Sequence, residues 1–159
     1  MSIGRLASTA SYATANSPTF TGTVSWAGAT LPASTATVAT SQTTTSATYT
    51  DLATAGPAVT VTTGTKAFVI TSARISGSAL GFDSYQSYAV SGATTVAASD
   101  TVAIMHGAFR ANTSMRASAG QMITGLTAGS NTFTAKYRVD STSTGTFLDR
   151  TITVIDMGS

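Results

Sequence analysis

Residues 131–139 read NTFTAKYRV, and this stretch decides the fold. From Phe133 onward every second position is apolar and the positions between are polar. The apolar set is Phe133, Ala135, Tyr137 and Val139, and the polar set is Thr134, Lys136 and Arg138. Successive side chains of a β-strand point to opposite faces, so the pattern indicates one buried and one solvated face. Ile152 and Val154 alternate with Thr151, Thr153 and Ile155 in the same way. This alternation is typical of an antiparallel sheet.

Further strands are predicted on both sides of this stretch, and turn residues separate most of them. The expected strands are residues 58–62, 66–76, 85–91, 101–110, 115–123, 131–139 and 146–155. Short strands at regular spacing with Gly- or Asn-containing turns favour an antiparallel sandwich or barrel. No segment has a convincing helical period, so the predicted class is all-β.

The first 48 residues differ from the rest of the chain. They consist largely of Ala, Ser and Thr, with too little apolar surface to fold alone against the cost in chain entropy. We therefore predict an extended N-terminal attachment arm and linker over residues 1–48, with residues 33–48 as the linker, and a β-sandwich domain over residues 49–159. Phe20 and Trp26 are the expected anchors of the arm, because large aromatic side chains dominate interface energetics.

The surface of the protein is expected to be poor in charge. Charged residues make up 9% of the chain, there is no Glu, and the formal net charge is +2. Interface cores are depleted in charged residues, so a Thr- and Ser-rich surface of this kind favours burial against copies of itself or other subunits. The alternative is a secreted or surface-exposed protein with the same Thr-rich exterior.

Several classes of function are disfavoured by composition. The basic residues are scattered rather than clustered along a phosphate track, so we expect no nucleic-acid partner. No stretch approaches the roughly 20 apolar residues of a membrane span, and the N-terminus lacks the apolar run of a signal peptide. We expect no membrane association and synthesis in a cytoplasm. The chain has no Cys, which excludes a disulfide framework and thiolate metal sites.

Catalytic, metal and cofactor sites are not expected either. His106 is the only histidine, no Gly-x-Ser-x-Gly elbow is present, and the six Asp residues do not have the spacing of a calcium loop. We interpret His106 as a packed or interface residue and predict a protein that is not an enzyme. Tyr85 and Tyr88, near Phe82, form either a platform for stacking sugars, an interface patch, or part of the domain's own core.

The chain also resembles β-sandwich domains of bacteriophage structural proteins. Residues 123–139 and 145–154 are similar to the last hairpins of such domains. Residues 48–61, 90–94 and 98–100 are similar to the first part of the same domains. Residues 17–24 are similar to short segments of phage fibre stems. It implies a jelly-roll-like sandwich of the tumour-necrosis-factor type, commonly a homotrimer, on a virion surface.

The resemblance leaves two functions open. The short arm favours a capsid decoration or head-fibre protein, with Phe20 and Trp26 attaching it to a major capsid protein or a tail protein. The alternative is a tail fibre or minor tail protein whose sandwich binds host-surface carbohydrate, with Tyr85 and Tyr88 as the glycan contacts.

Overall fold

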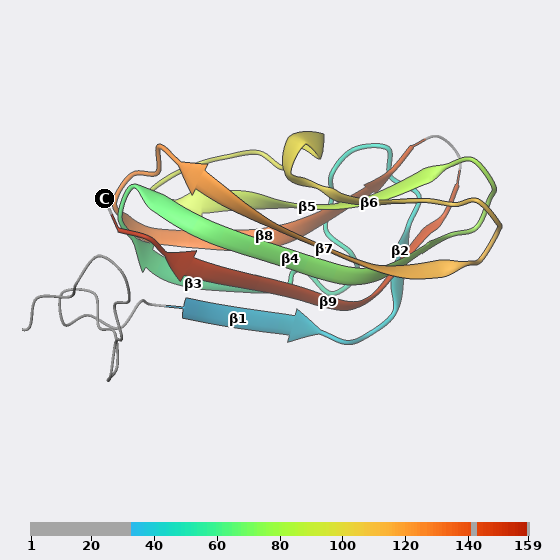
Figure 1. Ribbon diagram of the computed structural model, residues 1–159, viewed down its shortest axis with the longest axis horizontal. Helices are drawn as coiled ribbons and strands as arrows, with labels where there is room; N and C mark the ends of the chain where they lie inside the picture. Colours follow the sequence, from blue (N-terminus) through green and yellow to red (C-terminus); the bar gives the residue numbers. More distant parts are fainter. Residues whose placement is uncertain (1–32, 141–142, 159) are drawn as a thin grey trace, which may run out of the picture. The chain divides into compact units, whose positions relative to one another are not determined.

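The computed structural model describes residues 33–140 and 143–158, and this part of the chain forms two antiparallel sheets packed face to face (Figure 1). One sheet has the order β1-β9-β4-β7, with β2 also paired to β9, and the other has the order β3-β8-β5-β6. The strands are β1 (Ala33–Val38), β2 (Gln42–Thr44), β3 (Ala58–Thr63), β4 (Lys66–Gly77), β5 (Asp83–Gly92), β6 (Ile104–Gly107), β7 (Ser114–Thr124), β8 (Gly129–Val139) and β9 (Gly145–Asp156).

The connections between these strands define a jelly roll. The chain crosses between the sheets after β2, β3, β4, β6, β7 and β8, so strands that are consecutive in sequence mostly lie in different sheets. If β1 and β2 are taken together as one interrupted strand beside β9, the described residues form eight strands in two sheets, which is the jelly-roll architecture. The predicted fold class of the sandwich is therefore confirmed. The arm expected over residues 1–32 lies outside the described residues.

The core is built on the alternating stretch that predicted the fold. Phe133, Tyr137 and Val139 of β8 are fully buried, as are Ile152 and Val154 of β9. The rings of Tyr137 and Phe147 pack across the two sheets at 4.9 Å between centroids. The buried face predicted for residues 131–139 is thus the inner face of the sandwich.

The region predicted as one strand over residues 101–110 is shorter and more complex in the structure. A 3-10 turn, η1 (Asp100–Val102), precedes β6, which covers only Ile104–Gly107. The Ser99 hydroxyl accepts a hydrogen bond from the Thr101 N–H at 3.2 Å and so caps this turn. The cap competes with strand pairing, which shortens β6.

The predicted linker over residues 33–48 belongs to the sandwich, and the boundary after residue 48 is corrected accordingly. β1 and β2 both pair with β9, and Thr35 and Thr37 form hydroxyl–hydroxyl bonds to Thr153 and Thr151 at 2.9 and 3.2 Å. Ladder hydrogen bonds come from the backbone and need no large side chains, so an Ala- and Thr-rich stretch can complete a sheet without an apolar pattern.

Arg150 fastens this side of the sandwich from within. A bulge in the β4–β9 pairing and a positive φ of 50° at Asp149 accompany the inward turn of Arg150, which is fully buried. Its guanidinium donates to Gln42 Oε1 at 2.9 Å and lies 5.3 Å from the centre of the Tyr137 ring. Gly56 O accepts from both Arg150 Nη1 and the Tyr137 hydroxyl, at 3.4 and 2.8 Å. In the described residues no carboxylate pairs with Arg150.

Candidate interaction surfaces

Tyr85 and Tyr88 do not form the sugar platform that was one interpretation of the sequence. They are three residues apart on β5, and an odd spacing in a strand places side chains on opposite faces. Tyr88 is only 3% exposed and packs in the core at 6.2 Å from the Phe133 ring centroid. The prediction of Tyr88 as a glycan contact is therefore wrong, and its interpretation as a core residue is correct.

Tyr85 lies on the outer face of its sheet, but a neighbouring side chain already covers its ring. The Arg138 guanidinium stacks at 3.8 Å from the ring centre, and it donates to both carboxylate oxygens of Asp100, at 2.8 and 2.5 Å. The Tyr49 hydroxyl donates to the same carboxylate at 2.7 Å. These bonds fasten the η1 turn to β8, so the cluster is satisfied internally.

The pKa values in this cluster move in the directions expected of fixed partners. Hydrogen bonds from Arg138, and then from Tyr49, hold the pKa of Asp100 below its usual range. Burial, followed by the hydrogen bond to Asp100, raises the pKa of Tyr49 above its usual value. The carboxylate form of Asp100 is therefore the one that the folded structure stabilises.

His106 lies at the end of the sandwich where β6 leads into β7. It is 6% exposed, and its Nε2 lies 3.1 Å from the backbone oxygen of Thr113 in the β6–β7 connection. Across the described residues, no group of three or more His, Cys, Asp or Glu side chains could hold a metal ion. The geometry around His106 is that of a residue that fixes a loop.

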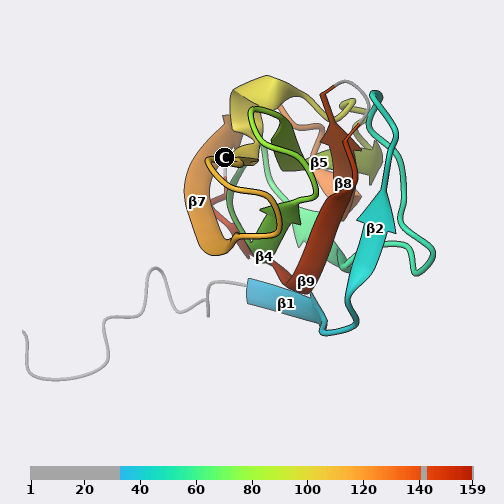
Figure 2. The same ribbon diagram turned by 90° about the vertical axis from the view of Figure 1, so that its right-hand side faces the viewer.

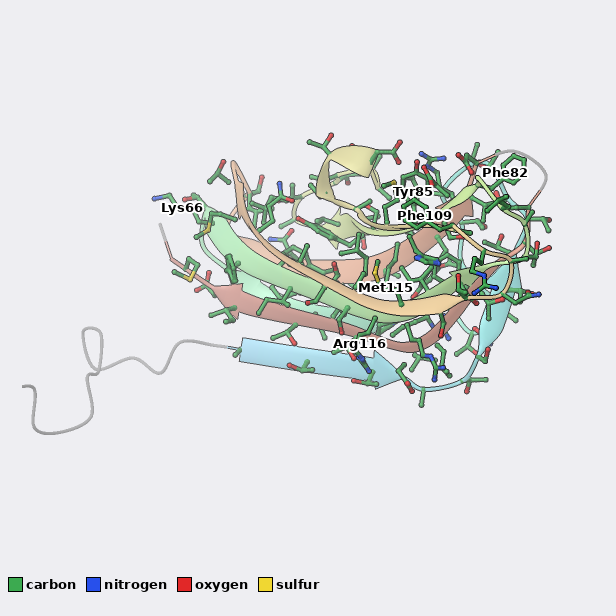
Figure 3. All side chains as sticks on the ribbon, turned by 45° about the vertical axis from the view of Figure 1, so that its right-hand side comes forward. Lys66, Phe82, Tyr85, Phe109, Met115 and Arg116 are labelled. Atoms are coloured by element: carbon green, nitrogen blue, oxygen red, sulfur yellow. The ribbon has the colours of Figure 1, made fainter. Side chains whose placement is uncertain are left out.

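The side of the sandwich between β6 and β7 carries exposed apolar side chains. Phe109 is 90% exposed, and Leu80, Met105 and Met115 near it are 64%, 48% and 46% exposed. A hollow of about 450 Å³ is lined by Met105, Phe109 and Met115. A second hollow, of about 230 Å³, lies between β7 and residues 96–102 and is bordered by Met122 and Ile123. We call this surface the β6–β7 seam; Figure 3 labels Phe109 and Met115 on it.

β7 borders the seam as an open edge of its sheet. It is 11 residues long, none of them is buried, and it contains one charged residue, Arg116, and no Pro. Edge strands of soluble proteins are normally short, charged or covered, because their free backbone groups invite pairing with another chain. Figure 2 shows β7 at the side of the sandwich away from β2. The weak alternation of β7 gave no signal of this exposure in the sequence.

A third surface is polar and lies on the outer face of the β1-β9-β4-β7 sheet. A hollow of about 250 Å³ opens there, lined by Ser41, Arg74, Ser76, Asn112, Ser114, Thr146 and Leu148. Arg74 lies directly opposite Arg116 in the β4–β7 register, so two arginines stand side by side next to the hollow. Sequence reasoning missed this pair because the two residues are far apart in the chain.

The expected anchors Phe20 and Trp26 lie outside the described residues. In the part of the chain that is described, no helix has the length and apolar character needed to cross a membrane. No protein-family model matches the chain, and no curated protein is significantly similar to it. The assignment of function therefore depends on the sequence and on these surfaces.

Proposed function

We propose that this protein is a non-enzymatic structural subunit of a bacteriophage virion, a trimeric capsid decoration or head-fibre protein. In this proposal the residues before β1, with Phe20 and Trp26, attach it to a capsid or tail protein, and the sandwich is displayed on the particle surface. The identification with a phage rests on the sequence resemblance described above. The jelly roll is compatible with it, since viral capsid domains use this architecture, but a fold alone does not assign a function.

The observation that carries the structural role is the β6–β7 seam. Large exposed apolar patches on a soluble protein generally mark interaction sites, and here the patch lies beside β7, an 11-residue edge strand that pairs with β4 on one side and is open on the other. The proposed occupant is a second copy of the chain. A contact between two different surfaces of identical subunits closes into a ring when the rotation between them allows it, and a trimer is the ring proposed here.

Truncation tests the attachment. A chain that starts at Leu31 keeps β1 and should remain soluble and melt cooperatively, but it should no longer co-purify with virions. The control is the full chain carrying Lys66→Gln, an exposed position at the start of β4, which should associate as the wild type does. Full decoration of particles by the truncated protein would place the attachment surface on the sandwich instead.

The second candidate function is a tail fibre or minor tail protein that binds host-surface carbohydrate. The polar hollow beside Arg74 favours it, because hydroxyl and amide side chains line a concave surface there. Electron micrographs of virions labelled with antibody to the chain separate the two candidates. Label on the head supports the decoration or head-fibre role, and label on the tail supports the alternative.

A further inference from the structure

The outer face of the β1-β9-β4-β7 sheet carries a local excess of positive charge. Arg74 and Arg116 are direct cross-strand neighbours, and like charges in that position destabilise a sheet. One carboxylate lies close by, Asp149, at 4.0 Å from Arg116 Nη2. That contact is exposed and contributes little stability, so the two guanidinium groups are poorly compensated within the described residues.

Arg74 is held in place while part of its guanidinium stays free. Its Nε donates to Ser114 Oγ at 3.1 Å, and in the described structure its two terminal nitrogens have no hydrogen-bond partner. A guanidinium presents parallel donors that match the two oxygens of a carboxylate. The fixed Nε therefore leaves donors available at the hollow for an anionic group.

The rest of the hollow fits the remainder of a sugar ring. Ser76, Asn112, Ser114 and Thr146 offer groups that both donate and accept hydrogen bonds, as sugar hydroxyls require, and Leu148 offers an apolar contact. The hollow of about 250 Å³ is below the range of roughly 300–1,000 Å³ typical of drug-sized ligands, so it suits one unit of a longer chain.

The hollow also lies toward the far end of the sandwich from the start of β1. Ala33 pairs with Ile155, which pairs with Phe68, and Arg74 is six residues further along β4. At about 3.3 Å per residue this separation is roughly 20 Å. The hollow is therefore well separated from the first residue of β1.

We propose that the hollow between β4, β7 and β9 binds an acidic sugar unit of a glycan, with the carboxylate held by Arg74, which lines the hollow, and with Arg116, its cross-strand neighbour, adding positive charge beside it. This goes beyond the proposed structural role and does not depend on it. The neighbouring hydroxyl and amide groups distinguish the site from a simple phosphate site, since they match ring hydroxyls that phosphate lacks.

Titration of the full chain with free sugars, followed by NMR or calorimetry, tests the proposal. D-glucuronic acid or N-acetylneuraminic acid should bind, and D-glucose should bind at least about tenfold more weakly. Binding should weaken at 0.5 M salt, since exposed charges are screened there. Absence of binding by either acid, equal binding of glucose, or stronger binding of inorganic phosphate than of the acidic sugars would overturn the assignment.

Matched variants locate the site. Arg74→Gln should weaken binding of the acidic sugar about tenfold or more and Arg116→Gln about threefold, while Lys66→Gln on the same strand should leave it unchanged. Arg74→Lys keeps the charge but loses the planar guanidinium with its parallel donors. The affinity of this variant for the acidic sugar should therefore lie between the affinities of the wild type and of Arg74→Gln. Unchanged affinity in a folded Arg74→Gln variant would refute the site.

Sugar binding by a chain that never associates with virions would refute the structural role and leave the site intact.

Discussion

The two long sides of the sandwich handle their edges in opposite ways. On the β1–β2 side, Arg150 is fully buried and bonded to Gln42 and to the carbonyl of Gly56. On the β6–β7 side, Phe109 is 90% exposed and β7 has no buried residue. Both sides end in an edge strand, since β1 and β7 are the two edges of one sheet, but a buried polar network fastens the first side and large apolar side chains are exposed on the second. This difference is the reason for our proposal that the second side contacts another copy of the chain.

Arg150→Ala should disrupt the β1–β2 side and have the largest effect. It removes a buried side chain and one of the two hydrogen-bond donors to each of Gln42 Oε1 and Gly56 O, which together should cost about 2–5 kcal/mol. Urea unfolding of the full chain measures the loss. Arg150→Met, which refills part of the volume, should lose less, and Arg116→Ala, an exposed control, should stay within about 0.5 kcal/mol. Equal losses for Arg150→Ala and Arg116→Ala would show that the buried network does not stabilise the fold.

Phe109→Ser should break the open side without unfolding the subunit. Since the ring is 90% exposed, thermal stability of an isolated subunit should hardly change, whereas self-association should weaken about tenfold or more. Light scattering should give three times the chain mass of 15.9 kDa for the wild type and a smaller average for the variant. A wild-type protein that is monomeric at micromolar concentration contradicts the trimer. Thr62→Ser, an exposed change on β3, is the matched control.

His106→Ala tests whether the seam has a chemical role as well. The change should cost roughly 1–2 kcal/mol, because the contact with the Thr113 carbonyl is lost and a buried ring is removed. Any hydrolytic activity measured on particles should be retained. Loss of such an activity in a variant with a wild-type-like circular dichroism spectrum would contradict the non-enzymatic assignment.

Acid should act weakly, through the cluster that fastens the η1 turn. The pKa of Asp100 is lowered in the folded protein, chiefly by hydrogen bonds from Arg138. The stabilisation from this group is therefore present above the unfolded pKa of about 3.9 and is lost as the pH falls through the lower folded value. Because Asp100 is largely exposed, the effect should be small. Asp100→Asn should be slightly less stable than the wild type at pH 7. Its free energy of unfolding in urea should fall less than that of the wild type between pH 5 and pH 2. An equal fall in the two proteins would assign the acid sensitivity to other groups.

The sequence by itself determined most of the strands after residue 57 and the inner face of the sandwich. Period-two alternation in residues 131–139 and around Ile152 is a local property, because each side chain's face follows from its position along the strand. The same rule, applied to Tyr85 and Tyr88, separates the two rings by face, and the structure confirms that Tyr88 is buried.

Only the tertiary structure decided how distant segments meet. Residues 33–44 look like a linker in isolation, yet they pair with β9, since backbone hydrogen bonding carries no side-chain signature. The inward turn of Arg150 accompanies a bulge, and the placing of Arg74 opposite Arg116 depends on the register of two strands some 40 residues apart. The open β6–β7 edge likewise follows from strand order, which is set by the packing of the whole chain rather than by any one segment.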